Sequence, residues 1–442
     1  MRRSAGQALW AAAFLVVLVA PLVAATDAGR SGGLTLEVSL VLGLVAMSAL
    51  VGVIVVVSRL RSLTRGLGIE QLLVVHRSLG LLVVGLVLAH VAAVVVADPR
   101  NVALFDLMHA PPRARAATVA TVALLLIALT AVARRRLRLS YRFWRVAHIV
   151  LAATAVGGTA LHVLWLRHLV ENTGMRAWFA ALAGGLLVVL VLRWGVRPLV
   201  AGRRAFRVRD VRSESGGVST IVLQRAGMRR TGRAPMTFAP GQFAWLRLRR
   251  WALLTDHPFS IASGTRPDGT VEFTVRHAGD WTRMLVRLRR GTTVYLDGPH
   301  GTFTVDHVRA TGLVLLAGGV GITPMMSMLR TLADRGDGRP HRLIVGGRDE
   351  TDLLFLHELD ALRDRLDLTV VPTLTRPGPG WTGTTGRIDA DLLDAVLPGE
   401  FRRNQLDYFI CGSAPFVAGV VGALDALAVP ARRVHTEQFD MV

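Results

Sequence analysis

Hydrophobic residues are distributed differently in the two halves of the chain. In the first half, uncharged apolar runs approach the roughly 20 residues that a helix needs to cross a bilayer core. They lie at about residues 7–25, 34–57, 72–97, 116–133, 143–166 and 176–194. From about residue 203, apolar and polar positions alternate over short stretches, which is typical of strands. The pattern predicts an all-α bundle of six transmembrane helices over residues 1–200, followed by folded domains outside the bilayer.

The first apolar run allows two interpretations. Arg2 and Arg3 precede it, and the small residues of "APLVAATDAG" (20–29) follow it, as in a secretory signal peptide. The run is also long enough to be a retained helix. The orientation predicted for the other five helices is the same in both cases, so the sequence leaves open whether this segment is cleaved.

Arginine-rich loops predict the orientation of the bundle. Arginines cluster in residues 58–66, in residues 134–142 and after Arg193, whereas the alternate loops are less basic. By the positive-inside rule, these arginine-rich loops and both chain termini face the cytoplasm. The sequence therefore predicts a multi-pass protein of the cell membrane, in which the third and fifth helices run in the same direction.

Those two parallel helices each carry a pair of histidines with the same spacing. His76 and His90 lie about four helical turns apart in the third helix, and the interval from His148 to His162 in the fifth helix is equal. At about 100° and 1.5 Å per residue, this spacing places both histidines of a helix on one face, about 21 Å apart. The four residues therefore form an inner pair, His76 with His148, and an outer pair, His90 with His162.

Two neutral imidazoles on opposite sides of one iron are the ligands of a six-coordinate haem suited to electron transfer. The two pairs thus predict two haems with these four histidines as iron ligands. Bundle histidines that only hydrogen-bond across helices are the alternative. Zinc would require all four side chains to converge, which the offset of about 21 Å forbids. Glycines between the ligands would let a planar macrocycle approach the backbone: Gly80, Gly85, Gly157 and Gly158.

The second half predicts two domains outside the bilayer. Over residues 203–307, short alternating strands such as "FRVRDV", "STIVLQR" and "GTVEFTVRH" indicate an antiparallel β-barrel. Within it, in "RHAGDWTRML" (276–285), Gly279 would free backbone amides and Thr282 could cap a helix that points at phosphate. Over residues 308–442, buried strands alternate with helical segments, which predicts a doubly wound α/β domain with a parallel sheet.

A glycine-rich turn opens the α/β domain. In "TGLVLLAGGVGITPMMSMLR" (311–330), a buried strand leads through glycines into a helix, with Thr323 expected as N-cap and Pro324 as first helical residue. Such a helix start presents free amides to a pyrophosphate, although a purely structural turn remains the alternative. Cys411 and Gly412 are expected at the carboxyl end of a later strand, where ligands bind in this fold.

Charge and cysteine content exclude several classes of protein. The formal net charge is +21, the sequence contains no lysine, and no platform of aromatic and basic residues accompanies the arginines, so nucleic-acid binding is not predicted. Cys411 is the one cysteine, which excludes an intrachain disulfide and an iron–sulfur cluster ligated by cysteines.

The motifs together resemble the ferric reductase and NADPH oxidase superfamily, in which a six-helix haem domain is fused to a ferredoxin-reductase-like module. The resemblance covers nearly the whole chain. It rests on the paired histidine spacings and, in the family's order, on "HPFS", "GDWT", "GPHG", "GGVGITP" and "CGSAP". It implies a transmembrane haem domain over residues 1–200, an FAD-binding barrel over 203–307 and an NAD(P)-binding domain over 308–442.

The resemblance also implies roles for single residues. Residues that would line the flavin are His257, Pro258, Phe259 and Ser260, with Ser260 near flavin N5. Residues that would hold the FAD pyrophosphate are Arg276, Gly279 and Thr282. Residues that would bind the nicotinamide nucleotide are Gly318, Gly319, Gly321, Thr323 and Pro324, with Cys411, Gly412 and Pro415 beside the nicotinamide. Arg348 would bind the adenosine ribose or a 2′-phosphate, favouring NADPH while leaving NADH open, and Phe439 would neighbour the flavin.

The function implied is that of an NAD(P)H-dependent oxidoreductase that uses FAD and two b-type haems. FAD takes two electrons as a hydride and can release them singly, which haem iron requires. Electrons would then reach an acceptor outside the membrane, such as a ferric or other metal complex. Three alternatives stay open: superoxide production from oxygen, donation to a partner protein, and a membrane-anchored flavin reductase without haem. The sequence names neither the acceptor nor the oligomeric state nor any regulation.

Overall fold

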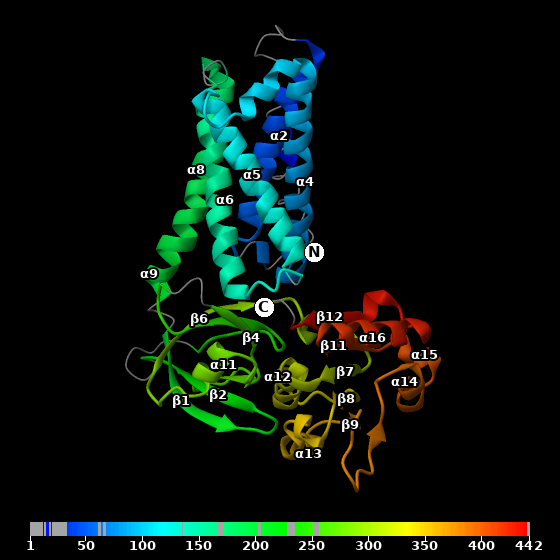
Figure 1. Cartoon of the computed structure of the whole chain (residues 1–442). Coiled ribbons are helices and arrows are strands. Elements are labelled where there is room, and N and C mark those ends of the chain that lie inside the picture. Colours follow the sequence, from blue (N-terminus) through cyan, green and yellow to red (C-terminus); the bar gives the residue numbers. More distant parts are fainter. Residues whose placement is uncertain are drawn as a thin grey trace. The chain divides into compact units, whose positions relative to one another are not determined.

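A computed structural model describes residues 33–60, 63–64, 68–134, 136–166, 169, 171–201, 205–227, 235–251 and 256–439, together with isolated positions before residue 33. The chain divides into two compact units, Met1–Arg197 and Pro198–Val442, which Figure 1 shows as helices in the first and mixed helices and strands in the second. The expected first span, residues 7–25, lies outside these described ranges.

Five helices of the first unit are long and apolar enough to cross a membrane, among the residues that the structure describes. They are α2 (Leu34–Val56), α4 (Ile69–Ala97), α5 (Pro112–Ala133), α6 (Tyr141–Leu164) and α8 (Thr173–Leu190). Each overlaps one of the spans predicted from the apolar runs. The last one extends beyond its predicted end, because a π-helical turn, η2 (Val191–Val196), and α9 (Arg197–Ala201) continue it.

Four of these helices share one core. Small and aliphatic side chains from α2, α4, α5 and α6 meet there, namely Ala49, Leu50, Val83, Ala123, Leu124 and Ala155. Leu81, Leu129 and Val150, in contrast, are more than half exposed. Exposed leucine and valine on helices of this length are the side chains expected to face lipid.

The next segment of the chain forms an antiparallel sheet of six strands, in the order β4-β3-β6-β1-β2-β5. The strands are β1 (Ala205–Ser213), β2 (Val218–Arg225), β3 (Phe243–Arg247), β4 (His257–Ser260), β5 (Thr270–Arg276) and β6 (Thr293–His300). An isolated bridge between Ile261 and Phe273 joins the two edges. The "HPFS" motif forms β4.

The last segment forms a parallel sheet, in the order β10-β9-β8-β7-β11-β12. The strands are β7 (Leu313–Gly318), β8 (His341–Gly347), β9 (Leu368–Leu374), β10 (Thr384–Thr385), β11 (Asp407–Gly412) and β12 (Val434–Gln438). The helices are α12 (Ile322–Asp334), α13 (Leu356–Arg363), α14 (Ala390–Val396), α15 (Glu400–Arg403) and α16 (Ala414–Ala426).

Two apolar cores lie on the two faces of this sheet. Side chains of α12 and α13 belong to one core and those of α14 and α16 to the other. β11 is buried throughout, which explains its nearly continuous apolar sequence. Helices on both faces of a parallel sheet make this a doubly wound α/β arrangement, as the sequence predicted.

A buried ion network connects the two sheet regions of the second unit. Arg330 on α12 lies 3.1 Å from Glu272 on β5 and 2.6 Å from Glu358 on α13. Arg330 also donates a hydrogen bond of 2.7 Å to the carbonyl of Ala262. Because Glu272 and Arg330 are both buried, breaking either side of this network would leave a charge without its partner inside the protein.

Candidate functional site

The rings of the inner pair of histidines lie close together, one on α4 and one on α6. The ring centroids of His76 and His148 are 6.2 Å apart, and the ring planes are inclined by 55°. A metal–nitrogen bond to histidine is about 2 Å long, so two imidazoles on opposite sides of one metal ion place their ring centres about 6 Å apart. The observed separation therefore fits one iron between the two rings.

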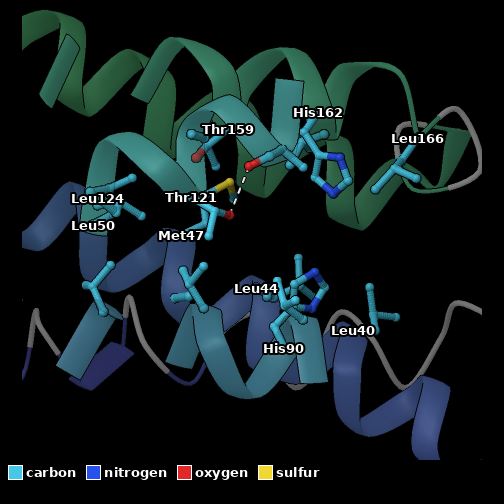
Figure 2. Close-up of a pocket in the computed structure, with 18 of the residues that line it drawn as sticks. Leu40, Leu44, Met47, Leu50, His90, Thr121, Leu124, Thr159, His162 and Leu166 are labelled. Carbon is cyan, nitrogen blue, oxygen red and sulfur yellow. Dashed lines mark hydrogen bonds between the residues drawn. The ribbon is translucent and has the colours of Figure 1, made fainter. Parts of the chain in front are cut away.

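The outer pair lines a common pocket between α2, α4, α5 and α6. Figure 2 shows the imidazole of His162 facing the pocket from one side and that of His90 from the other. Most of the other lining side chains are aliphatic, including Leu40, Leu44, Met47, Leu50, Val83, Val87, Leu124 and Leu166. A largely apolar pocket with two opposed imidazoles suits a flat, hydrophobic macrocycle that coordinates a metal.

Backbone carbonyls hold three of the four imidazoles through Nδ1. His76 Nδ1 lies 3.1 Å from the carbonyl oxygen of Val53, and His162 Nδ1 lies 2.9 Å from that of Arg113. His90 Nδ1 lies 2.7 Å from the carbonyl oxygen of Ser39. A carbonyl can only accept, so Nδ1 carries the proton in these rings and Nε2 keeps the lone pair that a metal needs.

The residues thus fit haem iron, with one local difference. His148 Nδ1 is buried and has no hydrogen-bond partner in the part of the chain that the structure describes. Trp144 lies beside it, with ring centroids 5.2 Å apart.

Three of the four glycines expected to admit the macrocycle do face open space. At Gly80, Gly85 and Gly157, an added Cβ would meet nothing within 4 Å. The expectation for Gly158 is wrong: a Cβ there would lie 2.8 Å from the carbonyl oxygen of Ala116. This glycine therefore lets α5 and α6 approach closely instead of making room for a ligand.

In the expected flavin region, two residues of β4 pack on a tryptophan. The ring of Trp281, on α11 (Asp280–Leu285), lies 4.3 Å from that of His257 and is stacked on Phe259 at 5.7 Å, centroid to centroid. Pro258 is half-buried and Ser260 is buried in the same strand. Sequence reasoning did not single out Trp281, although it lies within the quoted "GDWT" motif.

Thr282 caps α11 from inside the helix. The N-cap is Gly279, and the Thr282 hydroxyl accepts the Gly279 amide at 3.0 Å and donates to the Gly279 carbonyl at 2.9 Å. The sequence correctly associated Thr282 with capping. Both hydrogen bonds of the hydroxyl are nevertheless made within the helix start itself.

The side chain of Arg276 reaches the glycine-rich turn that follows β7. Its guanidinium lies 2.9 Å from the carboxylate of Asp352, in the turn η6 (Glu350–Asp352), and close to Gly319. The amide of Arg348 donates to the same carboxylate at 3.0 Å. Burial alone would raise the pKa of Asp352, but hydrogen bonds from Arg348 and Arg276 and their charges lower it overall.

The glycine-rich turn enters its helix earlier than predicted. A 3-10 turn, η5 (Gly319–Gly321), leads directly into α12, so Gly321 is the N-cap. Thr323 is therefore not the N-cap, and Pro324 is not the first helical residue; they are the second and third. The hydroxyl of Thr323 donates to the carbonyl of Val320 at 2.7 Å, which stabilises the turn from within.

Phe416 covers the glycines at three neighbouring strand ends. A Cβ would lie 2.9 Å from its ring at Gly318, 2.6 Å at Gly412 and 3.3 Å at Gly346. These glycines lie at the carboxyl ends of β7, β11 and β8, so their missing side chains make room for an aromatic ring of α16. No sequence pattern indicated this contact with Gly318 and Gly346, which are far from Phe416 in the chain, although Gly412 is close to Phe416.

Other predicted residues gather at the same sheet edge. A Cβ on Gly321 would collide with the carbonyl oxygen of Cys411, so only glycine lets the turn pack on β11. Cys411 is completely buried, and Pro415 is in the first turn of α16. The amide of Phe439 donates to the carbonyl of Gly412 at 3.2 Å, which brings Phe439 to this edge. Arg348 is exposed just beyond β8.

Family descriptions match three consecutive parts of the chain. A "Ferric reductase like transmembrane component" matches residues 42–159, an "FAD-binding domain" matches residues 215–304, and an "Oxidoreductase NAD-binding domain" matches residues 315–422. The ferric-reductase match contains all of α4 and α5 and therefore His76 and His90. It also contains His148.

The second half has relatives among reductases and flavohemoproteins. A ferredoxin–NADP reductase B of Sorangium cellulosum (strain So ce56) is 33% identical over 233 residues, which cover 50% of this chain and 93% of that protein. A flavohemoprotein of Bordetella pertussis is 29% identical over 54% of this chain and 61% of its own length. The solved flavohem-like FAD/NAD-binding domain of nitric oxide dioxygenase from Vibrio cholerae O1 biovar El Tor aligns with 53% of this chain and 98% of that domain, with a TM-score of 0.46 and 23% identity.

These matches define an NAD(P)H-dependent oxidoreductase whose FAD- and NAD-binding domains are of the ferredoxin reductase type. Together with the membrane component, they show that the chain belongs to the ferric reductase/NADPH oxidase type of membrane flavoprotein.

Proposed function

We propose that this protein carries electrons from NAD(P)H through FAD and two b-type haems to an acceptor on the outer side of the membrane, such as a ferric or other metal complex. The observation that carries the proposal is the arrangement of the histidines. His76 and His148 are spaced for one iron, and His90 and His162 face one apolar pocket.

The chain's own residues divide the work between the two units. His76 and His148 would hold the inner haem, and His90 and His162 the outer one, with iron changing its oxidation state by one electron at a time. With two histidines on each iron, no coordination position would be open, which would favour electron transfer at the haem edge over binding of the acceptor to iron. The acceptor therefore needs no dedicated ligand site in the chain.

In the second unit, the residues at the two sheet edges would bind FAD and the nicotinamide nucleotide. FAD, when bound, would convert one hydride into two single electrons. His257, Pro258, Phe259 and Ser260 would line the flavin, while Arg276, Gly279 and Thr282 would lie near its pyrophosphate. The turn Gly318–Pro324 and the Cys411–Pro415 segment would place the nicotinamide, with Ser260 and Cys411 nearest the reacting atoms and Phe439 beside them.

The orientation of the protein in the membrane is inferred from the positions of its arginine-rich loops. Arginine-rich loops at residues 58–66 and 134–142 favour the cytoplasmic side, which places both termini and the nucleotide-binding half in the cytoplasm. Cytoplasmic NAD(P)H would then be the donor. The lipid bilayer and a diffusible acceptor would be the other partners.

The test removes one ligand of each pair. His162→Ala should leave the inner pair intact, so that NADPH still reduces one haem while electron transfer to an outside acceptor collapses. His148→Ala should leave an outer haem that dithionite reduces and NADPH does not. Haem per protein is measured as the pyridine haemochrome, together with spectra reduced by NADPH and by dithionite.

His109→Ala is the matched control. His109 is exposed and pairs with Asp106 at 2.7 Å in the loop between α4 and α5. It should keep two haems per protein. If both His148→Ala and His162→Ala also keep two haems, the ligand assignment is wrong. An absence of haem in the unmodified protein would leave a membrane-anchored flavin reductase.

A further inference from the structure

Helix α2 carries no histidine, yet it contacts both histidines of α4. The carbonyl of Val53 accepts from His76 Nδ1 at 3.1 Å, and the carbonyl of Ser39 accepts from His90 Nδ1 at 2.7 Å. The interval from Ser39 to Val53 equals that from His76 to His90, and the contacts follow in the opposite order along the two helices. Helices α2 and α4 are thus antiparallel, and equal intervals along them span the same length. Carbonyls of α2 therefore orient both histidines of α4.

On the second pair of helices, α5 and α6, only one of the two histidines has such a contact with a backbone carbonyl. Arg113 on α5 accepts from His162 on α6 at 2.9 Å. In the same antiparallel register, the residue opposite His148 is Ile127, which follows Arg113 by the interval that separates the two histidines. His148 Nδ1 is nevertheless buried with no hydrogen-bond partner in the described parts of the chain. Both outer ligands are therefore held through Nδ1, but only one inner ligand is.

The hydroxyl of Ser39 gives His90 a side-chain contact. The other three histidines have no such contact among the described residues. The Ser39 hydroxyl oxygen lies 3.0 Å from His90 Nδ1 and donates to the carbonyl of His90 at 3.4 Å. The hydroxyl proton is directed to that carbonyl, so its oxygen and the Ser39 carbonyl both accept the Nδ1 proton. Ser39 is 2% exposed, which removes competition from water. One residue therefore fixes both the imidazole and the backbone of His90.

We propose that Ser39 is a positioning residue that strengthens His90 as an iron ligand and keeps the reduction potential of the outer haem below that of the inner haem. This inference rests on the proposed function. An acceptor at Nδ1 raises the basicity of the imidazole at Nε2, and a more basic ligand stabilises ferric over ferrous iron. Within the described ranges, the outer site has three such acceptors and the inner site has one.

The order of potentials has a functional consequence. A lower potential makes the outer haem the stronger reductant, and it is the one proposed to face the acceptor. The inner haem, with the higher potential, would take electrons from the flavin more readily. Transfer to the outer haem would then be uphill and would be driven by oxidation of the outer haem by the acceptor. The hydrogen bonds of α2 would thereby set which acceptors the protein can reduce.

The experiment is a potentiometric titration of the full-length, haem-loaded protein, followed by the visible haem bands. We expect two midpoint potentials in the unmodified protein. In Ser39→Ala, the lower potential should shift upward and the higher one should stay in place. Repeating the titration in the His148→Ala background, which retains only the outer pair, assigns the shifted potential to the outer haem.

Three further variants complete the design. Ser48→Ala removes an equally buried hydroxyl from the same helix, one that donates to the carbonyl of Leu44 at 3.0 Å, and it should shift neither potential. Ser39→Thr keeps the hydroxyl and should restore the original lower potential. If Ser39→Ala loses its outer haem, Ser39→Cys replaces it, because a thiol is a weaker acceptor and should produce the same upward shift.

The outcomes separate this inference from the proposed function. Two haems whose potentials do not respond to Ser39→Ala, or a shift confined to the inner haem, would overturn the role of Ser39 and leave the electron pathway intact. An equal shift in Ser48→Ala would also overturn it, since the effect would then be a general consequence of changing α2. An unmodified protein without haem would instead refute the proposed function.

Discussion

The guanidinium of Arg276, at the end of β5, and the carboxylate of Asp352, in the turn after β8, form an ion pair with an N–O distance of 2.9 Å. The pair joins a residue expected to hold FAD to the turn that follows β8. Asp352 also accepts the amide of Arg348. A negative charge thus lies beside the two arginines expected to bind phosphates.

Asp352→Asn should lower the KM for NADPH. The asparagine side chain keeps an oxygen that accepts from the backbone amide of Arg348. Because the negative charge is removed, Arg276 loses its ion pair and the phosphates of the nucleotide are no longer repelled. Unit charges about 4 Å apart interact by about 1 kcal/mol in water, so the expected change is about fivefold. Steady-state kinetics measure it, with Asp360→Asn as a control of equal charge. An unchanged KM with an altered FAD dissociation constant would assign Arg276 to the flavin alone.

Arg348→Ala should weaken the use of NADPH more than that of NADH. Only NADPH carries the additional phosphate that an exposed guanidinium could pair with. A charge-assisted hydrogen bond of about 1.5 kcal/mol corresponds to about a tenfold loss of kcat/KM for NADPH. The control is Arg363→Ala, since Arg363 pairs with Asp360 on the surface of α13. Equal losses with both nucleotides would remove Arg348 from this role.

Gly43→Ala should reduce the content of the outer haem. A Cβ on Gly43 would lie 3.1 Å from both Cε1 and Nδ1 of His90, so the imidazole would have to move. Alanine favours a helix over glycine by about 1 kcal/mol, so a loss cannot come from a weaker α2. The pyridine haemochrome should fall toward one haem per protein. Gly185→Ala on α8, where a Cβ meets nothing within 4 Å, should retain two; equal values in both variants would contradict the prediction.

Asp337→Asn should destabilise the protein at neutral pH but not near pH 2. A hydrogen bond from the Arg339 guanidinium is the main reason why the pKa of Asp337 is lowered to about 2, below the usual value of about 3.9. A lowered pKa in the folded state stabilises the protein above the unfolded pKa, and this contribution is lost as pH falls from about 4 to about 2.

The thermal midpoint reports this difference. For Asp337→Asn we expect a decrease of about 2 °C at pH 7, corresponding to at most about 1 kcal/mol, and a difference that shrinks as the pH approaches 3. Asp360→Asn removes a carboxylate that is 66% exposed and should have little effect at either pH. A pH-independent decrease would show that Asp337 stabilises the protein through something other than its charge.

The sequence by itself determined the features that depend on local periodicity. The lengths of the apolar runs predicted α2, α4, α5, α6 and α8, because about 20 consecutive apolar residues are enough to identify a helix that can cross a bilayer core. The equal spacing of His76 to His90 and of His148 to His162 predicted the pairing, since the helical repeat places both members of each helix on one face. The alternation of strands and helices predicted the parallel sheet in the same way.

Only the tertiary structure decided which groups meet across elements. Ser39 lies 51 residues from His90 in the chain, and nothing in the local pattern around either residue specifies the register of α2 against α4. Phe416 over Gly318 and Gly346, and Asp352 beside Arg276, are contacts of the same kind. Such contacts depend on the packing of whole elements against one another, whereas periodicity describes only one element at a time. The acceptors that hold the imidazoles, mostly backbone carbonyls, leave no mark in the amino-acid sequence, because every residue carries one.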